Sequence, residues 1–144
     1  MAKKLICLVL TLALFLSCTA PALAADSDVA SRFPAVKTYS GFPDVENSSS
    51  NWYYAPVKTC YETGMMVGAD TGFLPENPIK ISEVATIAAR IGEVLSGKAI
   101  AKDSSANPWY RPYVEYLEGY GVTGLLPTAN ATRADFFQML SKVV

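Results

Sequence analysis

The sequence predicts an all-α fold, in which two helix-loop-helix units pack as one small helical domain. Three observations lead to this prediction. A segment with a tryptophan occurs twice, residues with helical apolar spacing follow it both times, and proline or glycine marks the helix boundaries. The repeated segments are 51–57 and 108–114, whose tryptophans Trp52 and Trp109 lie 57 residues apart.

Residues 1–24 have the pattern of a secretory signal. Two lysines precede the apolar run 5–16, and small residues at positions 22 and 24 suit a signal peptidase, so we expect cleavage before Ala25. The run is too short to span a bilayer comfortably, and no stable membrane span is expected after its removal. Lipid attachment at Cys18 is the alternative, although the residues before it match that signal poorly.

Composition excludes several classes of function. Without the signal, ten basic and thirteen acidic residues give a net charge of −3, which disfavours nucleic-acid binding. The chain has no histidine, which excludes Ser-His and Cys-His catalytic pairs and most zinc sites. Cys60 is the one cysteine outside the signal and cannot form an internal disulfide. We therefore expect no enzyme, no metal and no cofactor.

A short helix opens each unit. Val57, Cys60 and Gly64 lie on one helical stripe, with a proline near its start and the glycine at its exit. The same pattern recurs 57 residues later and predicts a second short helix that ends at Gly121. Cys60 aligns with Leu117, so we expect a small buried hydrophobic residue there rather than a reactive thiol.

A longer amphipathic helix closes each unit. The apolar positions of 83–91 recur 52 residues later in 135–143. The second spacing is shorter because the first unit has a loop, 68–72, that the second unit lacks. The predicted organisation is an N-terminal segment at 25–41, a first repeat at 42–98 and a second repeat at 99–144.

These motifs resemble the S-layer homology (SLH) family over about residues 42–144. The first unit carries Phe42-Pro43-Asp44-Val45, Trp52, Gly64, the loop 70–75 and the segment 78–83. The second unit carries Asp103, Trp109, Gly121, Pro127 and Thr132-Arg133-Ala134-Asp135. The resemblance implies a non-enzymatic module that binds secondary cell-wall polysaccharide, an anionic and often pyruvylated glycan. It also implies that the protein is secreted and held at the bacterial cell wall.

The sequence departs from the family pattern in two ways. Family modules usually combine three units, whereas this chain has two, and Ile81 stands where the motif of the first unit has a basic residue. Two units would leave one side of the helical stripe uncovered. We expect the segment 26–41, a second copy or another SLH protein to cover it, and we favour self-association.

Six residues are candidate glycan ligands. Arg133 is the foremost, because a planar guanidinium suits a carboxylate such as a pyruvyl ketal, whereas its neighbours Thr132 and Asp135 are explained by a capping box. The indoles of Trp52 and Trp109 could stack on a sugar, but we favour a core role in which they pack one unit on the other. The remaining candidates are Tyr110, Tyr113 and Asp70.

The remaining candidates and the repeated acids are interpreted as follows from their positions. The tyrosines are numerous for the chain and several must lie off the apolar stripe, and such tyrosines often line carbohydrate or protein surfaces. Asp70 lies in the loop of the first unit, where the spacing fails the calcium-loop template and an Asx turn is the alternative. Glu83 and Asp135 occupy equivalent helix starts, which explains them without glycoside hydrolysis.

The chemistry of a groove separates the two remaining functions. An apolar seam rich in Met65, Met66 and valine would favour a protein partner, either a copy of the chain or another SLH protein. A cleft that combines basic and aromatic side chains would favour a glycan.

Overall fold

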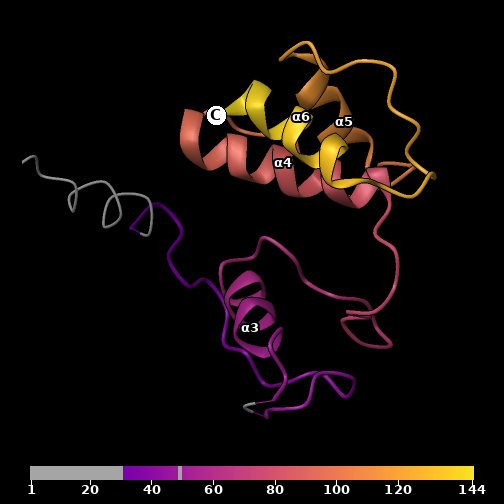
Figure 1. The fold of residues 1–144 in the computed structure, drawn as a ribbon. Coiled ribbons are helices and arrows are strands. Elements are labelled where there is room, and N and C mark those ends of the chain that lie inside the picture. Colours follow the sequence, from indigo (N-terminus) through magenta and orange to yellow (C-terminus); the bar gives the residue numbers. More distant parts are fainter. Residues whose placement is uncertain (1–30, 49) are drawn as a thin grey trace, which may run out of the picture. The chain divides into compact units, whose positions relative to one another are not determined.

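The structure, a computed structural model, describes residues 31–48 and 50–144 (Figure 1). Within them the helices are α3 (Tyr54–Glu62), α4 (Ile81–Ser96), α5 (Arg111–Glu118) and α6 (Arg133–Val143). The β-structure in this part of the chain is limited to isolated bridges, so the all-α prediction is confirmed for it. The predicted signal and its cleavage site lie outside the described residues.

Helix α3 lies where the first short apolar stripe predicts it. Gly64, at a φ of +74°, follows its last turn, and a left-handed glycine is a common helix exit. Val57 is the buried residue of α3. The carbonyl of Glu62 accepts hydrogen bonds from the N–H groups of Val36 and Lys37, which fixes part of the N-terminal segment against the helix end. Tilted and edge-on contacts between rings extend this packing through Tyr39, Phe42, Tyr54, Tyr61 and Phe73.

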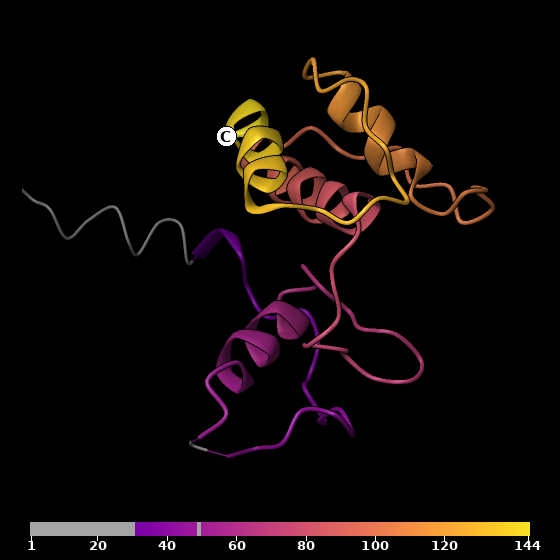
Figure 2. The same cartoon turned by 45° about the vertical axis from the view of Figure 1, so that its right-hand side comes forward.

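Helix α4 is the centre of the core. The side chain of Glu83 accepts the N–H of Lys80 at the start of the helix, and Gly97 ends it in the left-handed region. Ala85, Ala88 and Ala89 are completely buried. Their small side chains allow close approach, and α5 and α6 both pack on α4, as the views in Figure 1 and Figure 2 agree.

The buried residues contributed by the second half of the chain lie around α4. Tyr116 and Leu117 of α5 and Met139 and Val143 of α6 belong to this core cluster, together with Val122 from the connection between those two helices. Leu117 is fully buried, as its place on the predicted stripe requires.

Backbone hydrogen bonds join the starts of α4 and α6. The N–H of Ile81 donates to the carbonyl of Ala129, and the N–H of Ala131 donates to the carbonyl of Ile79. Lys80 and Asn130 form an isolated antiparallel bridge, and the Lys80 ammonium donates to Asn130 Oδ1 over 2.6 Å. The segment that leads into α6 is therefore held against the first turn of α4.

Two expectations about the core are corrected. Trp52 and Trp109 are 83% and 55% exposed, so the core role favoured for them is wrong. The physical reason is that Tyr116 and Leu117, in the second turn of α5, supply the bulk that packs on α4. Cys60 is half-buried rather than buried, and desolvation raises the pKa of its thiol.

Candidate functional site

An open groove of about 600 Å³ runs between α4 and the connection that precedes it. Its apolar lining includes Met65, Met66, Phe73 and Ile87, and its polar lining includes Glu83 and Thr86. Two cations, Lys80 and Arg90, and one aromatic residue of the second half, Trp109, complete the features that matter for binding. The groove is therefore neither a purely apolar seam nor a purely basic cleft.

Arg90 is held firmly at this groove. Its Nη1 donates to the carbonyl oxygens of Gly64 at 3.0 Å and Met65 at 2.9 Å, and its guanidinium lies 5.4 Å from the ring centre of Tyr113. These contacts hold the exit of α3 close to α4 and α5. They also fix a positive charge in the groove without a carboxylate partner among the described residues.

Three of the six candidate ligands lie together. The ring centre of Trp109 is 5.6 Å from that of Tyr110 and 6.5 Å from that of Tyr113, and both contacts are edge-on. Trp109 is 55% exposed, and an exposed indole offers the apolar surface that stacking on a sugar needs. Trp109 is the one of these three that lines the groove.

The other three candidates do not line the groove. Trp52 contacts Tyr53 edge-on at 5.7 Å, as Trp109 contacts Tyr110. Asp70 is exposed in a tight turn that the backbones of Ala69 and Gly72 close by two mutual hydrogen bonds, and its side chain makes no hydrogen bond in the described part of the chain. The turn at Asp70 is thus formed by the backbone and is not an Asx turn.

Arg133 is exposed at the first position of α6, outside the groove. The capping box beside it is confirmed: Thr132 Oγ1 accepts the N–H of Asp135, and the Asp135 carboxylate accepts the N–H and hydroxyl of Thr132. These bonds lower the pKa of Asp135. Glu83 and Asp135 each cap their own helix, as their equivalent positions predict.

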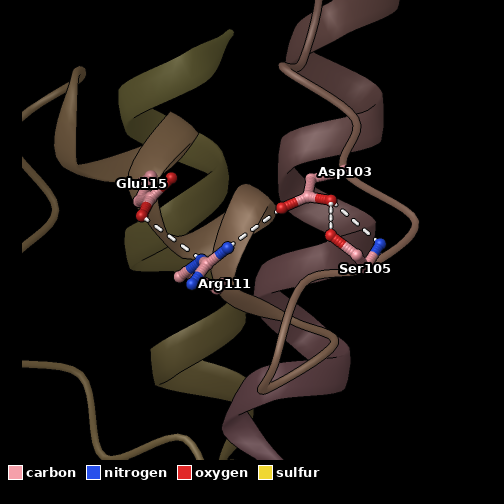
Figure 3. Close-up of polar contacts among 4 residues, drawn as sticks. All are labelled: Asp103, Ser105, Arg111 and Glu115. Carbon is pink, nitrogen blue, oxygen red and sulfur yellow. Dashed lines mark hydrogen bonds and ion pairs between the residues drawn. The ribbon is translucent and has the colours of Figure 1, made fainter.

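The motif aspartates Asp44 and Asp103 hold loops near the site by accepting hydrogen bonds. Asp44 accepts the N–H groups of Phe73 and Leu74, at 2.9 and 2.6 Å, and thereby fixes one wall of the groove. Asp103 accepts the N–H and hydroxyl of Ser105 and pairs with Arg111, which also lies 3.8 Å from Glu115 (Figure 3).

The pKa of each motif aspartate is lowered. Hydrogen bonds from the backbone of Phe73 and Leu74 are the main cause for Asp44. For Asp103 the main cause is the hydroxyl and N–H of Ser105, with Arg111 as a smaller one. Both carboxylates are therefore acceptors at neutral pH, and the second unit uses its aspartate locally because it lacks the loop that Asp44 binds.

Lys80 and Arg90 were missed as groove residues by the reasoning from sequence. The sequence does carry a signal for Lys80: lysine is a poor N-cap residue, so its place at the start of α4 suggests a role other than capping. Arg90 interrupts an otherwise small and apolar stretch of α4, which is a weaker signal. Within the described residues there is no cluster of side chains able to hold a metal ion, and no helix is both long and apolar enough to cross a membrane.

Comparison with known proteins identifies the first unit. The model of the S-layer homology domain matches residues 41–85. The chain is 31% identical, over 117 residues, to the surface-layer 125 kDa protein of Lysinibacillus sphaericus, an alignment that covers 72% of this chain and 10% of that protein. It is also 29% identical, over 114 residues, to an amylopullulanase of Thermoanaerobacterium thermosulfurigenes. That alignment covers 69% of this chain and 6% of that protein.

No solved structure matches the chain significantly. The chain spans a tenth or less of the length of these two relatives. The matched residues contain Asp44, Gly72 and Lys80, whose contacts build one wall of the groove. Through residues 41–85, the chain belongs to the S-layer homology family.

Proposed function

We propose that this chain attaches to the bacterial cell surface by binding an anionic cell-wall polysaccharide in the groove beside α4. SLH domains are non-catalytic modules that associate with cell-wall polymers, and one similar protein is named as a surface-layer protein. The observation that carries the proposal is the meeting of Trp109 with Lys80 and Arg90 in one open groove.

Each of these side chains suits a different part of such a ligand. The exposed indole of Trp109 offers a flat apolar surface for the face of a pyranose ring. Lys80 is exposed and attracts a carboxylate, such as a pyruvyl ketal. Arg90 already donates to two carbonyls, so we assign it a fixed positive field rather than a flexible contact.

Arg133 is proposed as a second contact for the glycan. Its side chain has no hydrogen bond or ion pair within the described residues, and it stands at the positive end of the α6 dipole. The basic residue that the family motif places at this point is absent from the first unit, where Ile81 is buried in the core. Tyr110 and Tyr113 would support Trp109, and Trp52 and Asp70 would contribute only to a ligand that extends beyond the groove.

Co-sedimentation with purified cell wall tests this function. The wild-type chain should bind the wall and lose that binding once the secondary polysaccharide is removed chemically. Trp109→Ala should weaken binding at least tenfold, and Val36→Ala is the control, because Val36 is an exposed apolar residue outside the groove. Equal loss in both variants would contradict the groove, and binding to neither wall preparation would contradict the function.

We also propose the two-repeat organisation, with repeats at 42–98 and 99–144. It is supported by the N-caps Lys80 and Thr132, which keep the 52-residue spacing of the sequence, and by the alternation of short and long helices. Export would precede attachment, with a mature chain that starts at Ala25. N-terminal sequencing of the secreted protein checks that start, and a lipid-modified Cys18 would contradict it.

A second candidate function is association with another copy of the chain. It is favoured by the large apolar side chains that are exposed on the second half, where Leu126 is 71% and Phe137 is 63% exposed. Exposed apolar side chains that gather into a patch often mark association sites.

A further inference from the structure

The second unit has a groove of its own, of about 370 Å³, at the positions that correspond to the first groove. With the sequence spacings of 57 and 52 residues, its lining residues Val122, Asp135, Met139 and Lys142 correspond to Met65, Glu83, Ile87 and Arg90 of the first groove. The two grooves were thus built by the same parts of the two proposed repeats.

One component is absent from the second groove. Trp109, which follows the first repeat, lines the first groove, whereas the residues that line the second groove include no aromatic side chain. The counterpart of Trp109 is Trp52, which is among the most exposed large side chains of the described residues. One end of the chain therefore has a groove without a tryptophan, and the other end has a tryptophan without a groove.

The long helices show the same mismatch. In α4 the stripe of Ala85, Ala88, Ala89 and Gly92 is buried, and at Gly92 it meets both α5 and α6: a β-carbon there would lie 3.2 Å from the Tyr116 ring and 2.8 Å from Cβ of Val143. The counterparts of this stripe in α6 are Phe137, Leu140, Ser141 and Val144. Phe137 and Val144 are exposed, whereas Leu140 is partly buried against the core, so the face that is covered on α4 is uncovered on α6 at Phe137 and Val144.

The short helices differ in the opposite sense. Where α5 presents the large Tyr116 and Leu117 to the small residues of α4, α3 has the smaller Thr59 and Cys60. Small residues on α3 and large ones on α6 would fill about the same volume as large residues on α5 and small ones on α4. Cores tolerate such exchanges when the total volume is kept.

From these correspondences we infer that copies of this chain associate head to tail, with α3 of one copy packed on the Phe137 face of α6 of the next. The contact continues, between chains, the packing of α5 on α4 within the chain. Trp52 of the incoming copy then lines the second groove beside Lys142, as Trp109 lines the first beside Arg90. A head-to-tail contact closes into a ring or extends into a filament.

This inference names the surface for the second candidate function and rests on the repeat organisation proposed above. It does not depend on glycan binding. Light scattering and sedimentation velocity on the chain that starts at Ala25 test it over a wide range of protein concentrations. The wild-type mass should rise above that of the monomer as concentration increases.

Two variants test the two faces. Phe137→Glu on α6 and Thr59→Glu on α3 should each weaken association at least tenfold, and both positions are exposed, so the fold should survive, as thermal unfolding would verify. Val36→Glu is the matched control, because Val36 is an exposed apolar residue outside both faces, and it should associate like the wild type. An equimolar mixture of the two variants should form dimers and nothing larger, because each mixed pair retains one intact interface.

The possible failures are distinguishable. A wild-type chain that stays monomeric at all concentrations would contradict both self-association and this surface. Wild-type association that neither variant weakens would leave self-association standing and overturn the head-to-tail faces. Variants that are monomeric alone and remain monomeric when mixed would indicate a symmetric contact, which also overturns the inference.

Discussion

Asp44 holds Leu74 in the left-handed region of backbone space. Asp44 Oδ2 accepts the N–H of Leu74 at 2.6 Å, and the φ of Leu74 is +59°. A leucine rarely adopts this conformation, which costs about 1 kcal/mol or more. The bond spans thirty residues of sequence and fixes the loop that forms one wall of the groove.

This pair predicts an acid sensitivity. The folded state lowers the pKa of Asp44 below its ordinary value of 3.8, so its contribution to stability is complete above that pH and is lost as the pH falls through the lowered pKa. Asp44→Asn should lower stability at neutral pH and flatten the loss of stability as the pH falls below the ordinary carboxyl pKa of 3.8. Urea unfolding as a function of pH measures both effects. Parallel curves for the two proteins would contradict the assignment.

Gly72 is predicted to be intolerant of any side chain. A β-carbon at this position would lie 2.6 Å from the Asp44 carboxylate, and φ there is +148°. Gly72→Ala should therefore cost about 1–3 kcal/mol of unfolding free energy. In a double-mutant cycle with Asp44→Ala, the double variant should lose less unfolding free energy than the sum of the losses in the two single variants, because the clash disappears with the carboxylate. Strict additivity would show that the φ value alone is responsible.

Gly92 tests the close packing of α4. Alanine has the better helix propensity, by about 1 kcal/mol, but its β-carbon would lie 2.8 Å from Cβ of Val143. Overpacking costs about 1–3 kcal/mol and should prevail, so Gly92→Ala lowers the unfolding free energy. Gly119→Ala, at the exposed end of α5, is the control: its β-carbon would lie 3.2 Å from the carbonyl oxygen of Tyr116, a looser contact, so it should lower the unfolding free energy less than Gly92→Ala does. A stabilised Gly92→Ala variant would mean that α4 and α6 are more loosely packed.

The two long helices should respond differently to changes at their N-caps. Thr132→Ala removes a hydroxyl cap from α6 and should cost about 1 kcal/mol. Lys80→Ser supplies α4 with a side-chain acceptor that lysine lacks, but it also removes the bond from Lys80 Nζ to Asn130 Oδ1, so the two effects should offset and stability should change less than in Thr132→Ala. The same change removes a cation from the groove, so wall binding should weaken while stability changes little. A Lys80→Ser variant that binds the wall as tightly as the wild type would remove Lys80 from the proposed site.

The sequence predicted the helices better than it predicted the site, and the residues show why. Spacing places Val57, Leu117 and Met139 on apolar stripes because a helix has a fixed period, and all three are buried. The spacing does not indicate which other helix or loop covers an apolar stripe. Trp52 and Trp109 stand at equivalent helix starts, and that equivalence holds equally well for an exposed residue as for a buried one. The bond from Asp44 to Leu74 joins distant segments, and no periodicity encodes it.

The last prediction concerns the cooperativity of the two halves. Ala85, Ala88 and Ala89 belong to the first half, yet the core cluster that buries them draws Tyr116, Leu117, Met139 and Val143 from the second half. A chain divided at Gly97 would expose this surface on both fragments, and helices of this length are marginal in water without tertiary packing. We therefore expect fragments 25–97 and 98–144 to be largely unfolded when separate and to regain helix content when mixed. Circular dichroism measures this, with the intact chain as the reference for full helix content. Two fragments that each unfold cooperatively in isolation would show that the repeats are independent domains.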